Sequence, residues 1–164
     1  MTVLTVADPS AMHQLGERLG RLLRAGDLVI LSGPLGAGKT TLTRGIGEGL
    51  GVRGPITSPT FVLARTHPSL IEGPPLVHVD AYRLGSALEV DDLDIDFARS
   101  VVIAEWGTGY LDGIVDSMLE LSIERPVGSG LEIEGDEPVE PRVVTVSASG
   151  PRWQQIDWTT LGGA

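Results

Sequence analysis

One segment of the chain has the residue types and spacing of a phosphate-binding loop. Residues 33–40 read Gly-Pro-Leu-Gly-Ala-Gly-Lys-Thr, which satisfies the pattern G-x-x-x-x-G-K-S/T. Glycines in such a loop let successive backbone N–H groups point at a phosphate, and the positive end of the following helix dipole adds to the attraction. Lys39 is the only lysine among the 164 residues. The pattern predicts that Lys39 reaches the β- and γ-phosphates of a nucleotide.

The residues around Lys39 complete the predicted contacts with the nucleotide. The hydroxyl of Thr40 can ligate Mg²⁺, and Thr41 is placed to contact the α-phosphate. The backbone N–H groups that would surround the phosphates belong to Gly36, Ala37 and Gly38. Together these residues predict a site for a nucleotide with its magnesium ion.

A phosphate-binding loop also needs an acid at the end of a neighbouring strand to hold the magnesium. Two acids follow apolar runs, Glu105 after Val-Val-Ile-Ala and Asp80 after Leu-Val-His-Val. We assign Glu105 to the magnesium because its run is the more apolar and indicates a strand beside the loop strand. We assign Asp80 to the region of the γ-phosphate, where it would orient or deprotonate the attacking water. The alternative for either acid is a structural carboxylate that hydrogen-bonds a loop.

Four further residues are candidates with open alternatives. Thr60, in Thr-Ser-Pro-Thr-Phe, would sense the γ-phosphate or belong to a proline turn. Arg83, close to Tyr82, would stabilise phosphate charge or pair with a carboxylate. Trp106 would cover the nucleotide or fill the core. The three histidines have no metal-ligand spacing, and we interpret none as a ligand.

The apolar pattern predicts the elements that position these residues. Asp8-Pro9 begins a helix with apolar residues at three- and four-residue spacing, and Gly26 is expected to cap its end. A second helix follows the loop and closes at Gly51. Strands are expected at residues 2–6, 27–32, 61–66, 76–79 and 101–104, a hairpin over residues 119–146, and a short helix or tail from residue 153.

Composition limits the classes of function. The formal net charge is −10, and ten acids lie in two windows without a base, residues 89–96 and 132–140. Such a chain is poorly suited to strong direct binding of nucleic acid. The chain has no cysteine and no apolar run of roughly 18 residues, so we expect a cytoplasmic protein without disulfides or membrane insertion. At roughly 150 residues per domain, residues 1–164 form one domain.

Four segments in a fixed order resemble one small family. They are GPLGAGKTT, TSPTF, HVDAYRL and IAEWG, between residues 33 and 107. The combination is similar to the TsaE (YjeE) family of bacterial ATPases required for N6-threonylcarbamoyladenosine in tRNA. HVDAYRL and the following Glu-Trp are the discriminating pieces, because the loop alone indicates only nucleotide binding.

The resemblance implies an α/β protein with the P-loop NTPase fold, a mainly parallel sheet flanked by helices, and an antiparallel C-terminal hairpin. It also implies ATP hydrolysis with Mg²⁺ and action in a complex with the TsaB and TsaD proteins. With such partners, the acidic charge leads to the hypothesis that contact with tRNA is made only through that complex. By this match Lys39, Thr40, Asp80 and Glu105 have the roles given above. The family's motif positions also include Thr60, Tyr82, Arg83 and Trp106. Arg142 falls where the family often has an arginine near the nucleotide.

Two other classes of function share the loop. A small metabolite or nucleotide kinase would bring several arginines in a lid, whereas Arg125, Arg142 and Arg152 are scattered and flanked by acids. A nucleotide-dependent binding module would bind ATP without turning it over. Because no arginine is an obvious finger, we expect weak hydrolysis by the isolated chain and stimulation by its partners.

Overall fold

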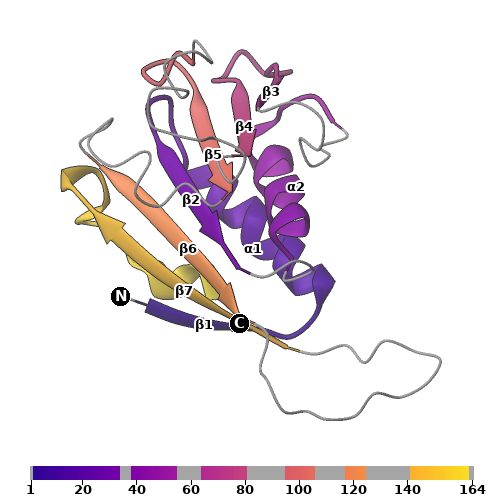
Figure 1. Ribbon diagram of the computed structural model, residues 1–164, viewed down its shortest axis with the longest axis vertical. Helices are drawn as coiled ribbons and strands as arrows, with labels where there is room; N and C mark the ends of the chain where they lie inside the picture. Colours follow the sequence, from indigo (N-terminus) through magenta and orange to yellow (C-terminus); the bar gives the residue numbers. More distant parts are fainter. Residues whose placement is uncertain are drawn as a thin grey trace.

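The computed structural model describes residues 2–33, 38–54, 64–80, 95–105, 117–124 and 141–162 (Figure 1). Along these ranges the strands are β1 (Thr2–Val6), β2 (Leu28–Ser32), β3 (Ala64–His67), β4 (Leu76–Asp80), β5 (Val101–Glu105), β6 (Met118–Glu124) and β7 (Arg142–Ser149). The helices are α1 (Pro9–Leu22) and α2 (Lys39–Leu50), followed by the 3-10 helices η2 (Pro151–Trp153) and η3 (Trp158–Gly162). The strands expected from the apolar pattern are therefore present, except that residues 61–63 of the strand expected at 61–66 lie outside the described ranges. β3 runs one residue beyond the predicted end of that strand.

All of these strands belong to one sheet, in the order β1-β7-β6-β2-β5-β4-β3. β2 pairs parallel with both β5 and β6, and β4 pairs parallel with β5. The antiparallel pairs are β1 with β7, β6 with β7, and β3 with β4. The mainly parallel sheet and the antiparallel C-terminal hairpin are thus confirmed. The carboxyl ends of β2, β4, β5 and β6 all lie at one end of the sheet. Open α/β sheets bind their ligands at this carboxyl end.

Both helices pack on the same face of this sheet (Figure 1). Their buried residues recur at three- and four-residue spacing, as in Leu15 and Leu19 of α1 and Leu42 and Ile46 of α2. Residues of β2 face both ways: Val29 and Leu31 join the helix-covered cluster, and Leu28 and Ile30 join a second cluster on the opposite face. The continuous apolar run before the glycine loop is therefore a strand buried on both faces.

Glycines allow α1 and α2 to approach very closely. A Cβ added at Gly16 would lie 2.4 Å from a backbone oxygen of α2, and one added at Gly45 would lie 2.2 Å from a backbone oxygen of α1. The same contact recurs four residues further along each helix, at Gly20 and Gly49. Since real Cβ atoms do not approach other heavy atoms this closely, the position of α2 against α1 depends on these glycines.

The end of α1 differs from the prediction. α1 ends at Leu22 with Leu23 as an extended C-cap, so Gly26 is not the cap. Gly26 does have a positive φ of 94°, but it lies in the turn that leads into β2. The Asp27 carboxylate accepts a hydrogen bond from the Arg24 N–H at 2.6 Å and stabilises that turn.

The C-terminal residues pack against the turn between α1 and β2. Arg152 pairs with the buried Asp27, with Nε 3.1 Å from Oδ1, and donates to the Leu22 carbonyl at 2.8 Å. Its guanidinium carbon lies 4.4 Å from the ring centroid of Trp153, which is buried. The short helix expected near the C-terminus is therefore the pair η2 and η3. Within the described ranges, no helix is long and apolar enough to cross a membrane.

Candidate nucleotide site

The two ends of the glycine loop meet through Lys39. β2 leads into Gly33 at the carboxyl edge of the sheet, and α2 begins at Lys39. The Lys39 ammonium donates a hydrogen bond to the Gly33 carbonyl at 2.5 Å. The positive charge is thereby held beside Gly33, near the start of the helix, where an anion would also meet the helix dipole.

Gly38 gives the loop its entry into α2. It is the N-cap residue with φ 113° and ψ 13°, a left-handed conformation that favours glycine. The nearest atom to an added Cβ would be Cε of Met12 at 3.3 Å. No side chain caps this end of α2 and no acid lies in its first turn, so the backbone N–H groups there are not satisfied by a carboxylate of the helix.

Thr40 and Thr41 lie in the first turn of α2 and are half-buried. Thr43, one turn further, is buried and its hydroxyl donates to the Lys39 carbonyl at 2.8 Å. The first two threonines are thus at the end of the helix next to the loop, where the sequence predicts contacts with magnesium and the α-phosphate. Those contacts stay predictions.

The register of the sheet separates the two candidate acids. Glu105 of β5 pairs with Leu31 of the loop strand β2, and Asp80 of β4 pairs with Glu105 from the other side. Neighbouring strands lie about 4.8 Å apart, so Asp80 is one strand further from the loop. Glu105 is 7% exposed. The expectation that β5 lies beside the loop strand is therefore confirmed, which was the basis for choosing Glu105 as the acid near magnesium.

His78 is a neighbour of Glu105 that sequence reasoning missed. Its Nε2 lies 3.6 Å from Oε1 of Glu105, too long for a hydrogen bond, and the histidine side chain is fully buried. Among the described residues neither of its ring nitrogens has a hydrogen-bond partner. The spacing of His78 and Asp80, two residues apart on one strand, was the available signal. This spacing indicates a contact with Glu105 only when β4 is known to pair with β5.

Arg142 lies at the same sheet edge. β7 runs antiparallel to β6, so its first residues lie beside Glu124 at the carboxyl end of β6. Arg142 is half-buried and two strands away from β2. The fold thus brings Arg142 to the end of the sheet that carries Lys39 and Glu105, and its contact with the nucleotide stays a prediction. The other predicted contacts fall outside the described residues: Gly36, Ala37, Thr60, Tyr82, Arg83 and Trp106.

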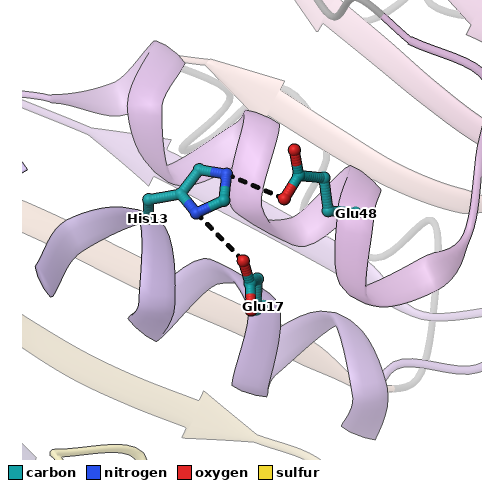
Figure 2. Close-up of side chains that lie close together, drawn as sticks. All are labelled: His13, Glu17 and Glu48. Atoms are coloured by element: carbon teal, nitrogen blue, oxygen red, sulfur yellow. Dashed lines mark ion pairs between the residues drawn. The ribbon is translucent and has the colours of Figure 1, made fainter. Parts of the chain in front are cut away.

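A second group of polar side chains joins the two helices (Figure 2). Nδ1 of His13 lies 3.1 Å from Glu17 of α1, and Nε2 lies 3.0 Å from Glu48 of α2. These ligand-type atoms all lie within 4.8 Å of one another. One metal ion binds one ring nitrogen, whereas here the two carboxylates lie at different nitrogens. The arrangement therefore fits a polar bridge between α1 and α2 better than a metal site.

A glycine loop between a buried strand and a helix, with an acid at the end of the adjacent parallel strand, defines the P-loop NTPase class. The structure resembles the crystal structure of YdiB from Bacillus subtilis with a TM-score of 0.64. The two chains are 26% identical, and the match covers 98% of this chain and 90% of that one.

Sequence comparison gives the family within this class. The family model described as threonylcarbamoyl adenosine biosynthesis protein TsaE matches residues 6–130. The tRNA threonylcarbamoyladenosine biosynthesis protein TsaE of Streptomyces coelicolor is 57% identical over 93% of this chain and its own full length. That of Bacillus subtilis is 30% identical over 91% of this chain and 87% of its own. The chain belongs to the TsaE family, which takes part in tRNA threonylcarbamoyladenosine biosynthesis.

Proposed function

We propose that this protein is a Mg²⁺-dependent ATPase that acts in the cytoplasm with TsaB and TsaD in the N6-threonylcarbamoyladenosine modification of tRNA. The observation that carries the ATPase part is the position of Glu105, in register with the loop strand and beside the Lys39 end of α2. Family membership supports the assignment to this tRNA modification pathway.

The donor set on this edge of the sheet fits ATP with magnesium. Lys39 supplies a point charge for the β- and γ-phosphates, and the backbone N–H groups at the start of α2, which no side chain caps, suit an anion. The hydroxyl of Thr40 and the carboxylate of Glu105 are oxygen donors of the kind that Mg²⁺ prefers. Bound magnesium would supply neutralisation of the charge that develops on the phosphates.

The remaining residues position the reaction. We assign Asp80, one strand beyond Glu105, to orient or deprotonate the attacking water. His78 packs beside Glu105 and restricts where its carboxylate can lie. Arg142 approaches the nucleotide from the β7 side of the edge. Charge stabilisation by an arginine finger would come from the partners, so hydrolysis by the isolated chain is weak.

The acidic charge supports indirect contact with tRNA. A net charge of −10 repels the phosphate backbone, which leaves the contact with tRNA to TsaB and TsaD. The two acidic windows fall largely outside the described residues, and we keep the hypothesis that they face basic surfaces on the partners.

One reconstitution tests the proposal. ATP hydrolysis is measured for the chain alone and with TsaB and TsaD, and modified tRNA is counted over many turnovers with and without the chain. We expect stimulation by the partners and a loss of sustained modification with Lys39→Ala. Arg99→Gln is the matched control, because Arg99 is 87% exposed and lies in the turn before β5. Equal hydrolysis with and without partners, or phosphoryl transfer to a small acceptor faster than hydrolysis, would contradict the proposal.

A further inference from the structure

The edge strand β3 borders a surface cavity of about 480 Å³ with positively charged walls. Its lining consists of residues 53–54, which follow α2, and residues 64–68, which form β3 and the proline after it. Arg53, Arg65 and His67 contribute the charged or titratable side chains, and none of the lining residues that the structure describes is acidic. The Thr66 hydroxyl adds a hydrogen-bonding group to the lining.

His67 is the buried polar group of this cavity. It is 8% exposed and hydrogen-bonds the backbone of Arg53. Its Nε2 has no hydrogen-bond partner among the described residues. Buried polar atoms are nearly always hydrogen-bonded, so the unpartnered ring nitrogen of this lining residue is a candidate donor for a ligand.

The charges around the cavity favour a negatively charged ligand. Burial lowers the pKa of the His67 ring, the electrostatic effects of His78 on β4 and of Arg65 lower it further, and the Arg53 backbone opposes this in part. Burial is the largest of these causes, and the arginines of the lining add a positive potential that also disfavours a further proton. An anion would offset this potential and allow Nε2 to be protonated and to donate a hydrogen bond.

We propose that this cavity binds a phosphate-type oxyanion, either free phosphate or the phosphate group of a small metabolite, through Arg53 and His67. The guanidinium fork matches two oxygens of a phosphate, and the charged ring donates to a third. Binding takes up one proton from solvent at Nε2. A long polyanion such as RNA is disfavoured by the net charge of −10.

This cavity is separate from the candidate nucleotide site. His67 pairs with Leu76, the first residue of β4, whereas Lys39 and Glu105 lie at the opposite end of the strands. Ala64, at the other end of the lining, pairs with Val79, but β3 is three strands away from the loop strand β2. The walls come from the two ends, 53–54 and 64–65, between which residues 55–63 run. An anion bound here would connect these two ends, and the proposal does not depend on the ATPase function.

Amide NMR of the full chain during a sulfate titration tests the proposal. Sulfate is the probe because its charge does not change between about pH 8 and about pH 5.5, and sodium chloride keeps the ionic strength constant. We expect saturable shifts at the amides of residues 53, 54 and 64–67, with binding about tenfold tighter at the lower pH. Arg53→Gln should weaken binding about tenfold, and His67→Gln should remove the pH dependence.

Three further measurements separate the outcomes. Lys39→Ala should leave the cavity shifts unchanged while it removes any shifts at residues 38–41. Arg24→Gln, which changes an exposed arginine outside the cavity lining, is the charge-matched control. Tighter binding of glycerol 3-phosphate than of inorganic phosphate would assign the cavity to a metabolite, and equal binding to free phosphate. Absent or non-saturable shifts, equal binding by all variants, or shifts with a single-stranded RNA alone would overturn the proposal.

Discussion

Asp80 and Glu105 are paired residues at the carboxyl ends of the parallel strands β4 and β5. Glu105 is also in register with the strand that enters the glycine loop, and Asp80 is one strand further away. Two acids in neighbouring positions can serve different roles when one is held by a metal and the other faces the water that reacts. This relationship leads to separate predictions for the two residues.

Asp80→Asn should lower the rate of ATP hydrolysis and leave nucleotide binding intact. Loss of a general base costs about 10²–10⁴ in rate, and a neutral amide preserves the size of the side chain. Hydrolysis with TsaB and TsaD and a nucleotide dissociation constant would be measured on the same preparation. Glu72→Gln is the control for loss of one acid, since Glu72 is exposed and lies outside both acidic windows. Unchanged hydrolysis would make Asp80 a structural carboxylate.

Glu105→Gln should weaken the binding of magnesium. Because the carboxylate would hold the ion, we expect the Mg²⁺ concentration for half-maximal hydrolysis to rise at least about tenfold. Binding of nucleotide without Mg²⁺ should change little. An activity titration with Mg²⁺ checks this, and an unchanged midpoint with a lower maximal rate would assign Glu105 to the water instead.

The site was predictable from the sequence where its signals are contiguous. The run Leu28–Ser32, the glycines and Lys39 are adjacent in the chain, so one motif indicates a strand, a loop and a helix. Glu105 was predictable because its four preceding apolar residues are typical of a central parallel strand.

Other features depend on residues distant in the chain. The contact between His78 and Glu105 requires the register of β4 against β5, which no local pattern gives. The spacing of Gly16 and Gly45 has no meaning until α1 is known to pack on α2. The prediction for Gly26 was wrong because the side chain of Asp27 stabilises a separate turn after the helix end.

Gly45→Ala should destabilise the fold. The added Cβ would lie 2.2 Å from the His13 carbonyl oxygen, so α1 and α2 must separate. Overpacking of this kind costs typically about 1–3 kcal/mol in the free energy of unfolding. Gly73→Ala is the matched control, because its nearest neighbour, the Ser69 hydroxyl, would be 3.4 Å away. Urea denaturation of both variants checks the prediction, and equal midpoints would contradict it.

Arg152→Met should also destabilise the fold, through Asp27. The pair is bidentate, with Nε 3.1 Å from Oδ1 and Nη2 3.2 Å from Oδ2, and Asp27 is buried. Removal of one partner from a buried ion pair costs about 3–5 kcal/mol, because the other charge is left uncompensated. The double variant with Asp27→Asn should be more stable than the single one. A double-mutant cycle by urea unfolding measures this coupling, and additive effects would show that the pair does not interact.

His67 gives the chain a specific dependence of stability on pH. Burial and the nearby Arg65 and His78 hold the pKa of His67 below the value of 6.5 that it has when unfolded. As the pH falls through about 6.5, the unfolded chain takes up a proton that the folded chain does not, so the free energy of unfolding decreases. It decreases further until the pH reaches the lower pKa of the folded state.

His67→Gln should remove this part of the decrease. Urea unfolding between about pH 7.5 and about pH 5 measures it as the difference in the free energy of unfolding between the two chains. The chains should approach each other in stability toward low pH. Sulfate should reduce the decrease in the unchanged chain and not in the variant, because an anion favours the charged ring. A difference between the chains that stays constant with pH would show that His67 titrates alike in both states.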